Sequence, residues 1–109
     1  MDLTFNKNED HNKLLLSQLR KRLAQIKLGG GKSRIEKQHS LGKMTARERI
    51  DYLLDAKKDS IEIGAVVGEG MYQEHGGCPS GGVVIKMGYV SGKQCIVVAN
   101  DATVKAGAW

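Results

Sequence analysis

The feature that most restricts the fold is a pair of β-branched runs near the C-terminal end, at residues 83–90 and 94–99. Ser91-Gly92-Lys93 separates them, so the pattern predicts an antiparallel hairpin with glycine available for a positive φ. The second run, CIVVA, is continuously apolar, as expected of a strand covered on both faces of a layered α/β sheet. Only ten residues follow Ala99, too few for the covering helices. We therefore expect residues 1–109 to be the front portion of a longer domain, weakly stable alone.

A capping box begins a short helix in the middle of the chain. Thr45 is followed three residues later by Glu48, so each side chain is placed to bond the backbone amide of the other residue. An apolar stripe follows at helical spacing, formed by Ala46, Ile50, Leu53 and Leu54. Cations crowd the first turn, where a helix already carries partial positive charge: Lys43, Arg47 and Arg49. Two interpretations stay open, a bound anion such as a phosphate, or simple pairing with neighbouring carboxylates on a solvated face.

The N-terminal part is basic and helical. Glu9 to Leu28 predicts an amphipathic helix whose narrow leucine stripe packs against something larger or a second chain, with Gly29 placed at its C-cap. The run Gly29 to Ser33 lacks the first glycine of a P-loop and follows a helix instead of a strand, so it predicts a flexible turn. Residues 32–42 are expected to form a loop or a short helical piece, with a solvated His39.

The region between the helices and the hairpin is irregular. Ile61-Glu62-Ile63 is a candidate short strand, and the glycine-rich segment 64–82 predicts a loop packed closely on other backbone. His75 and Cys78 lie three residues apart without a third group to orient them, which favours surface or structural roles. Neither cysteine belongs to a disulfide or metal pattern, and no signal peptide, transit peptide or membrane span is evident. These features predict a cytoplasmic, bacterial protein without metal or membrane.

The formal net charge of +5 is unevenly distributed, with +7 on residues 1–58 and −2 on residues 59–109. An alternative function is therefore that of a small basic module that binds a polyanion or nucleic acid. The span 20–49 holds 10 Lys/Arg against 2 acids but no aromatic residue. Because nucleic-acid modules usually interleave aromatic side chains for stacking, we do not expect a nucleic-acid partner.

Two longer motifs, GKMTARERI at residues 42–50 and ANDATVKAGA at residues 99–108, occur in that order. Together they resemble the N-terminal part of the carboxyltransferase (β) subunit of biotin-dependent acyl-CoA carboxylases, over residues 13–109. The second motif is most similar to the methylcrotonoyl-CoA branch, because other branches commonly have an aromatic residue at the position of Ala102.

The resemblance implies an α/β fold, the front of a crotonase-like carboxyltransferase domain, here two helices followed by a hairpin. It divides the chain into an N-terminal helix, residues 1–30, and an incomplete carboxyltransferase portion, residues 31–109. The implied reaction moves a carboxyl group from carboxybiotin, carried by a biotin carboxylase/biotin carrier partner subunit, to the enolate of an acyl-CoA, and the implied assembly is a homo-oligomer of β subunits. In the family the oxyanion-hole donors come from turns that would follow residue 109, so no catalytic residue is expected here and the chain alone is expected to be inactive.

What the resemblance leaves to this chain is part of the acyl-CoA site. It places one segment near the path of CoA, where small residues let pantetheine pass close to the backbone: Thr103, Val104, Lys105, Ala106 and Gly107. The phosphates are expected to meet Lys105 and, with less support, the cations of the capped helix, Lys43, Arg47 and Arg49. A compatible local interpretation makes 103–107 the first turn of a helix capped by Thr103.

Overall fold

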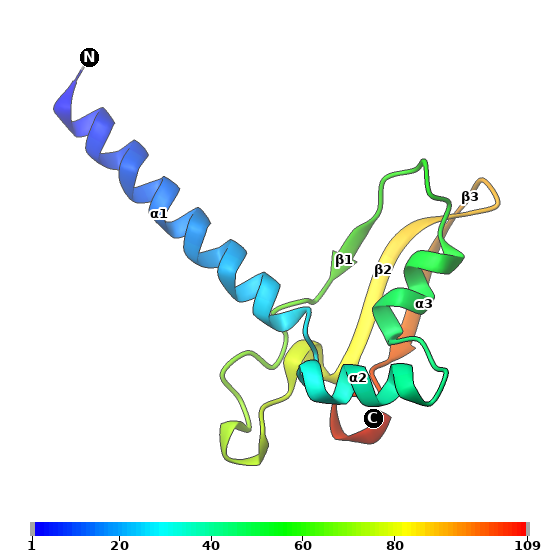
Figure 1. The fold of residues 1–109 in the computed structure, drawn as a ribbon. Helices are drawn as coiled ribbons and strands as arrows, with labels where there is room; N and C mark the ends of the chain where they lie inside the picture. The colour runs from blue at the N-terminus through cyan, green and yellow to red at the C-terminus, as the bar shows by residue number, and fades with distance from the viewer. Residues whose placement is uncertain (1, 109) are drawn as a thin grey trace.

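The computed structural model describes residues 2–108 as a small body of helices and sheet from which one long helix projects (Figure 1). That helix, α1 (Leu3–Ile26), starts earlier than the predicted Glu9, because the Asp2 carboxylate caps it by accepting the Thr4 amide at 3.0 Å. Its leucines lie exposed as far as Leu19, Leu23 is half-buried, and only Ile26 at its end is buried. The predicted glycine cap is wrong, since Lys27 in a right-handed conformation ends the helix.

Two short helices follow. α2 (Lys32–Ser40) occupies most of the segment for which a loop or a short helical piece was expected. α3 (Ala46–Leu53) confirms the capping box: Thr45 Oγ1 accepts the Glu48 amide at 3.3 Å, and Glu48 Oε1 accepts the Thr45 amide at 3.2 Å. The predicted apolar stripe is met by Ala46, Ile50 and Leu54, which are buried, but not by Leu53, which is 50% exposed. α2 has no side-chain cap that could have indicated it in the sequence.

The sheet has three antiparallel strands in the order β1 (Ile61–Ile63), β2 (Val83–Val90) and β3 (Lys93–Asn100). The predicted hairpin is confirmed, with a two-residue turn in which Ser91 and Gly92 have φ of 51° and 82°. The Asp55 carboxylate accepts both turn amides, Ser91 at 2.9 Å and Gly92 at 2.8 Å. This contact ties the end of α3 to the hairpin.

The core lies between α3 and one face of the sheet. Ile50 of α3 and Leu54, the residue that caps the C-terminal end of α3, pack with Val84, with partly buried residues of the strands around them: Val90, Val97 and Ala99. The opposite face is apolar but exposed within residues 2–108, as Ile96 at 64% exposure illustrates. The prediction that β3 is covered on both faces is therefore met on the α3 face only.

The glycine-rich segment 64–82 is a compact loop with two 3₁₀ turns, Gln73–His75 and Pro79–Gly82. Close backbone packing was predicted, and it is found at Gly68, where a Cβ would lie 2.4 Å from the Cys78 carbonyl oxygen. Among the described residues no His, Cys, Asp and Glu side chains cluster as a metal site, and no helix there combines the length and apolarity that a membrane crossing needs.

Candidate functional site

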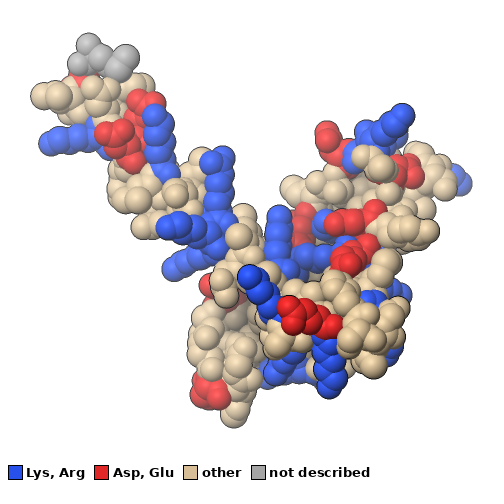
Figure 2. Space-filling model, viewed as in Figure 1, with Lys and Arg blue, Asp and Glu red and all other residues tan. Residues whose placement is uncertain are grey.

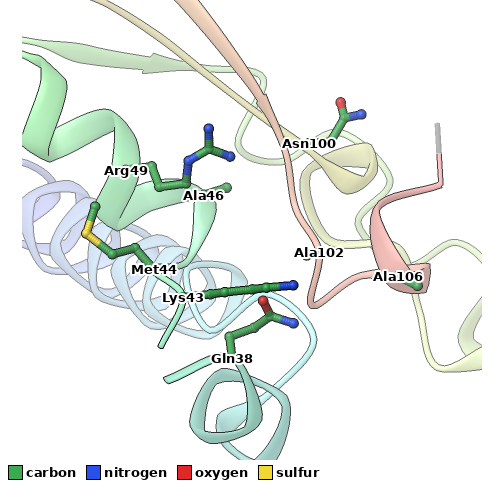
Figure 3. A pocket seen from close by; sticks show the side chains of 8 residues that line it. All are labelled: Gln38, Lys43, Met44, Ala46, Arg49, Asn100, Ala102 and Ala106. Atoms are coloured by element: carbon green, nitrogen blue, oxygen red, sulfur yellow. The ribbon is translucent and has the colours of Figure 1, made fainter. Parts of the chain in front are cut away.

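A pocket of about 620 Å³ opens between the start of α3 and the segment that leaves β3 (Figure 3). Its volume is within the range of small-molecule sites. Helix α2, the α2–α3 loop, α3 and the C-terminal segment each contribute to its wall: Gln38, Lys43, Met44, Ala46, Arg49, Asn100, Ala102 and Ala106. Segments some 60 residues apart in sequence thus meet at one cavity.

The helical side of this pocket is cationic. Figure 3 shows Lys43 extending across the cavity toward the segment with Ala102, while Arg49 projects from the first turns of α3. The N-terminal end of α3 adds its partial positive charge. Among residues 2–108, no Asp or Glu lines the pocket. The cavity therefore suits an anionic ligand, and Lys and Arg bind both phosphate and carboxylate oxygens.

The opposite wall is small and conformationally strained. Lys105, Ala106 and Gly107 form a 3₁₀ turn in which all three residues are left-handed, with φ of 48°, 55° and 82°. Non-glycine residues in this region cost about 1–3 kcal/mol each and cluster at ligand sites. The turn is not the first turn of an α-helix, so the interpretation of Thr103 as a helix cap is wrong. It brings the methyl group of Ala106 to the pocket beside Ala102.

Arg47 lies outside the pocket, in a largely buried ion pair. Its Nε donates to Glu62 Oε1 at 2.9 Å, Nη2 donates to Ser80 Oγ at 3.2 Å, and Nη1 to the Lys27 carbonyl at 3.4 Å. The Arg47 and Glu62 side chains are 14% and 11% exposed. Arg47 thereby joins α3 to β1, to the loop and to the end of α1, and its carboxylate partner is not one of the near neighbours expected from helical spacing.

The remaining predicted residues surround the pocket without lining it. Thr103 and Val104 are buried, each with 3% exposure, behind its C-terminal wall. The Lys105 ammonium lies 5.0 Å from the centre of the Tyr72 ring in the glycine-rich loop, a cation–π distance. Of the eight predicted residues, the structure brings Lys43, Arg49 and Ala106 together at the cavity.

Sequence reasoning missed five lining residues: Gln38, Met44, Ala46, Asn100 and Ala102. Met44 and Ala46 lie within the first family motif, and Asn100 and Ala102 lie within the second, which is the one signal that could have indicated them. Gln38 depends on α2, whose helical extent was not predicted. The position of Asn100 depends on where the pairing of β2 with β3 ends, and the β2–β3 turn sets the register of that pairing.

Glu48 is a second polar centre, on the exposed side of α3. Its Oε1 lies 2.6 Å from His39 Nε2, so His39 is paired with a carboxylate instead of merely solvated. The hydrogen bond from His39, followed by those from Thr45, lowers the pKa of the Glu48 carboxyl below its ordinary value of 4.5. This pair ties α2 to α3 beside the pocket.

Basic side chains also gather outside the pocket. Figure 2 shows Lys and Arg around the C-terminal half of α1 and over α2, with few acidic side chains between them. The corresponding residues are Arg20, Lys21, Arg22, Lys27, Lys32, Arg34 and Lys37. These cations belong to the basic half of the sequence, residues 1–58, as do Lys43 and Arg49 of the pocket.

Comparison with known proteins assigns the class. Residues 37–109 match the carboxyl transferase domain family. The chain is similar to the probable mitochondrial methylcrotonoyl-CoA carboxylase beta chain of Drosophila melanogaster, with 42% identity over 96% of this chain and 18% of the relative. It is also 39% identical to the biotin-dependent 3-methylcrotonyl-coenzyme A carboxylase beta1 subunit of Mycobacterium tuberculosis, over 92% of this chain and 18% of that subunit.

The crystal structure of transcarboxylase 12S, described as a hexamer with methylmalonyl-coenzyme A and methylmalonic acid bound, superposes with a TM-score of 0.76 at 36% identity. The match covers 85% of this chain and 18% of the transcarboxylase chain. The protein therefore belongs to the carboxyl transferase domain family, and its α/β fold is the N-terminal part of a crotonase-like carboxyltransferase domain. The chain spans about 18% of the length of the curated relatives it matches.

Proposed function

We propose that this chain supplies the phosphate-binding part of an acyl-CoA site in a biotin-dependent carboxyltransferase. The observation that carries the proposal is the cavity itself, which has a volume of about 620 Å³. Lys43 and Arg49 line one side of it, and Ala102 and Ala106 line the other. Phosphate groups of CoA would bind the two cations near the α3 N-terminus, and the narrow pantetheine arm would pass Ala102 and Ala106. Lys105 would reach a phosphate only by leaving Tyr72.

The substrate and the reaction follow from the relatives as proposals. Two relatives are named as methylcrotonoyl-CoA carboxylase subunits, which favours a methylcrotonoyl-CoA-like substrate. Biotin would be carried by a partner subunit, and the transcarboxylase hexamer supports assembly of several copies. We further propose that the chain binds acyl-CoA without transferring carboxyl groups by itself, because the family resemblance assigns the oxyanion-hole donors to turns outside residues 1–109.

The test is calorimetric titration of the chain with CoA. Replacing Lys43 and Arg49 with alanine together should weaken binding on the order of tenfold or more, because two charge-assisted contacts are lost. A matched control, Lys57→Ala with Lys93→Ala, removes the same charge outside the pocket. It should leave affinity nearly unchanged at about 0.15 M salt, where distant charges are screened.

Equal losses of CoA affinity in the two double variants would indicate non-specific charge attraction and would refute the site. Unchanged affinity in the Lys43/Arg49 variant would refute it as well.

An activity test uses a chimera in which this chain replaces the matching 18% of the mycobacterial beta1 subunit. There the Lys43/Arg49 substitutions should raise KM for acyl-CoA more than they lower kcat, since they remove ground-state binding. A kcat loss without a change in KM would contradict the phosphate role.

A further inference from the structure

We propose that Thr103 is a positioning residue that holds the left-handed turn of the pocket wall in place. It acts through a cluster around two buried residues, Asp101 and Thr103, that also includes Gly29, Gly30 and Arg34 and is called here the Thr103 clamp. This inference rests on the proposed acyl-CoA site and names the residues that shape it. Thr103 itself contacts neither the cavity nor the ligand in this account.

The clamp joins the turn after α1 to the segment after β3. The Gly30 amide donates to Thr103 Oγ1 at 2.9 Å, and the Thr103 hydroxyl donates to Asp101 Oδ1 at 2.5 Å. Asp101 Oδ1 also accepts the Thr103 amide at 2.9 Å, and Arg34 Nη1 donates to the Thr103 carbonyl at 3.1 Å. Asp101 and Thr103 are 5% and 3% exposed. Thr103 therefore uses its hydroxyl as donor and acceptor, and both of its backbone polar groups, within the clamp.

Two glycines make this close approach possible. A Cβ at Gly30 would lie 1.7 Å from the Thr103 carbonyl oxygen, and a Cβ at Gly29 would lie 2.6 Å from both Asp101 Oδ2 and Thr103 Oγ1. The glycine run that resembles a phosphate loop is thus a packing surface for the C-terminal segment. The prediction that it is simply a flexible turn is corrected by these contacts.

The clamp continues into the pocket wall through backbone bonds. Asp101 N donates to the Gly82 carbonyl at 2.9 Å, Val104 N to the Asp101 carbonyl at 3.0 Å, and Gly107 N to the Val104 carbonyl at 3.0 Å. The last bond closes the turn that carries Ala106. Because left-handed Lys105 and Ala106 are strained, they persist only where neighbouring structure fixes both ends of the segment. The clamp fixes the end nearer β3.

The experiment compares two variants. Thr103→Val keeps the shape of the side chain but loses the hydroxyl group, whereas Thr103→Ser keeps the hydroxyl group. Amide hydrogen exchange at Gly30 and Gly107 reports the clamp and the turn without any ligand. Thr103→Val should speed exchange at both amides and weaken CoA binding on the order of tenfold, whereas Thr103→Ser should stay close to the original chain. Asp55→Asn is the control, because it loosens two amide bonds at the β2–β3 turn instead.

Unchanged exchange at Gly107 in Thr103→Val overturns the clamp whether or not CoA binds. Faster exchange with unchanged CoA affinity overturns its role in shaping the pocket. An equal loss of affinity in Asp55→Asn assigns the effect to global stability and also overturns it. Absence of CoA binding by the original chain is a failure of the proposed function instead. In that case the exchange of Gly30 and Gly107 still decides whether the clamp holds the turn.

Discussion

Replacing Arg47 with methionine tests whether this residue is part of the scaffold or of a phosphate site. The change removes the cation from a pair in which Arg47 and Glu62 are 14% and 11% exposed, and it leaves Glu62 buried. Within the described residues Glu62 Oε2 already has no hydrogen-bond partner, so Oε1 would lose the one strong contact of the carboxylate. Removing one member of a buried pair costs about 3–5 kcal/mol of stability. Because both side chains keep some contact with solvent, we expect a loss at the lower end of this range, about 3 kcal/mol.

That loss is large against the roughly 5–15 kcal/mol that separates folded and unfolded states of a domain. Replacing Arg47 and Glu62 together with methionine should recover most of it, because both charges leave the interior and apolar volume remains. Urea unfolding of the four chains gives the coupling energy of the pair. A double variant as unstable as Arg47→Met would refute the ion-pair argument. Little loss of stability in Arg47→Met, accompanied by weaker CoA binding, would assign Arg47 to the phosphate site.

Two further predictions concern Gly30 and Glu48. Gly30→Ala should destabilise the chain by about 3 kcal/mol through overpacking against Thr103. The control Gly42→Ala, at φ +73° with no described atom within 4 Å of its Cβ, should cost about 1 kcal/mol. Equal melting temperatures of the two variants would contradict this prediction. Because hydrogen bonds lower the folded-state pKa of Glu48 below 4.5, its ionised form stabilises the fold above that value and this contribution disappears as pH falls through the folded-state pKa. The stability difference between the original chain and Glu48→Gln should therefore shrink in acid, and a pH-independent difference between pH 7 and pH 3 would exclude the effect.

Features set by neighbouring residues could be predicted from the sequence. The Thr45/Glu48 capping box and the Ser91-Gly92 turn each depend on a few adjacent positions, and both occur where expected. The start of α1 was placed too late because Asp2 caps a turn of mixed polarity that precedes the leucine stripe. α2 was not recognised as a full helix because it begins after Gly31 without a side-chain cap and buries no residue.

Features that depend on long-range contacts could not be predicted from the pattern. The pairing of Arg47 with Glu62 requires β1 to lie beside α3, and the sequence offers nearer carboxylates. The role of Gly30 depends on Thr103, 73 residues away. For the candidate site, the resemblance pointed to two segments, and residues of both segments line the cavity. Their convergence on one cavity depends on how α3 packs against β3, which orients Lys43 and Arg49 toward Ala106.

The central claim is that CoA binds in the cavity between α3 and the C-terminal turn. Amide chemical-shift mapping of the ¹⁵N-labelled chain during titration with CoA tests it directly. If CoA binds there, saturable shifts should be concentrated at Lys43, Arg49, Ala102 and Ala106, and the β2–β3 turn should be unaffected. Shifts confined to the basic half of α1, around residues 20–22, would instead indicate non-specific attraction of an anion and would contradict the account.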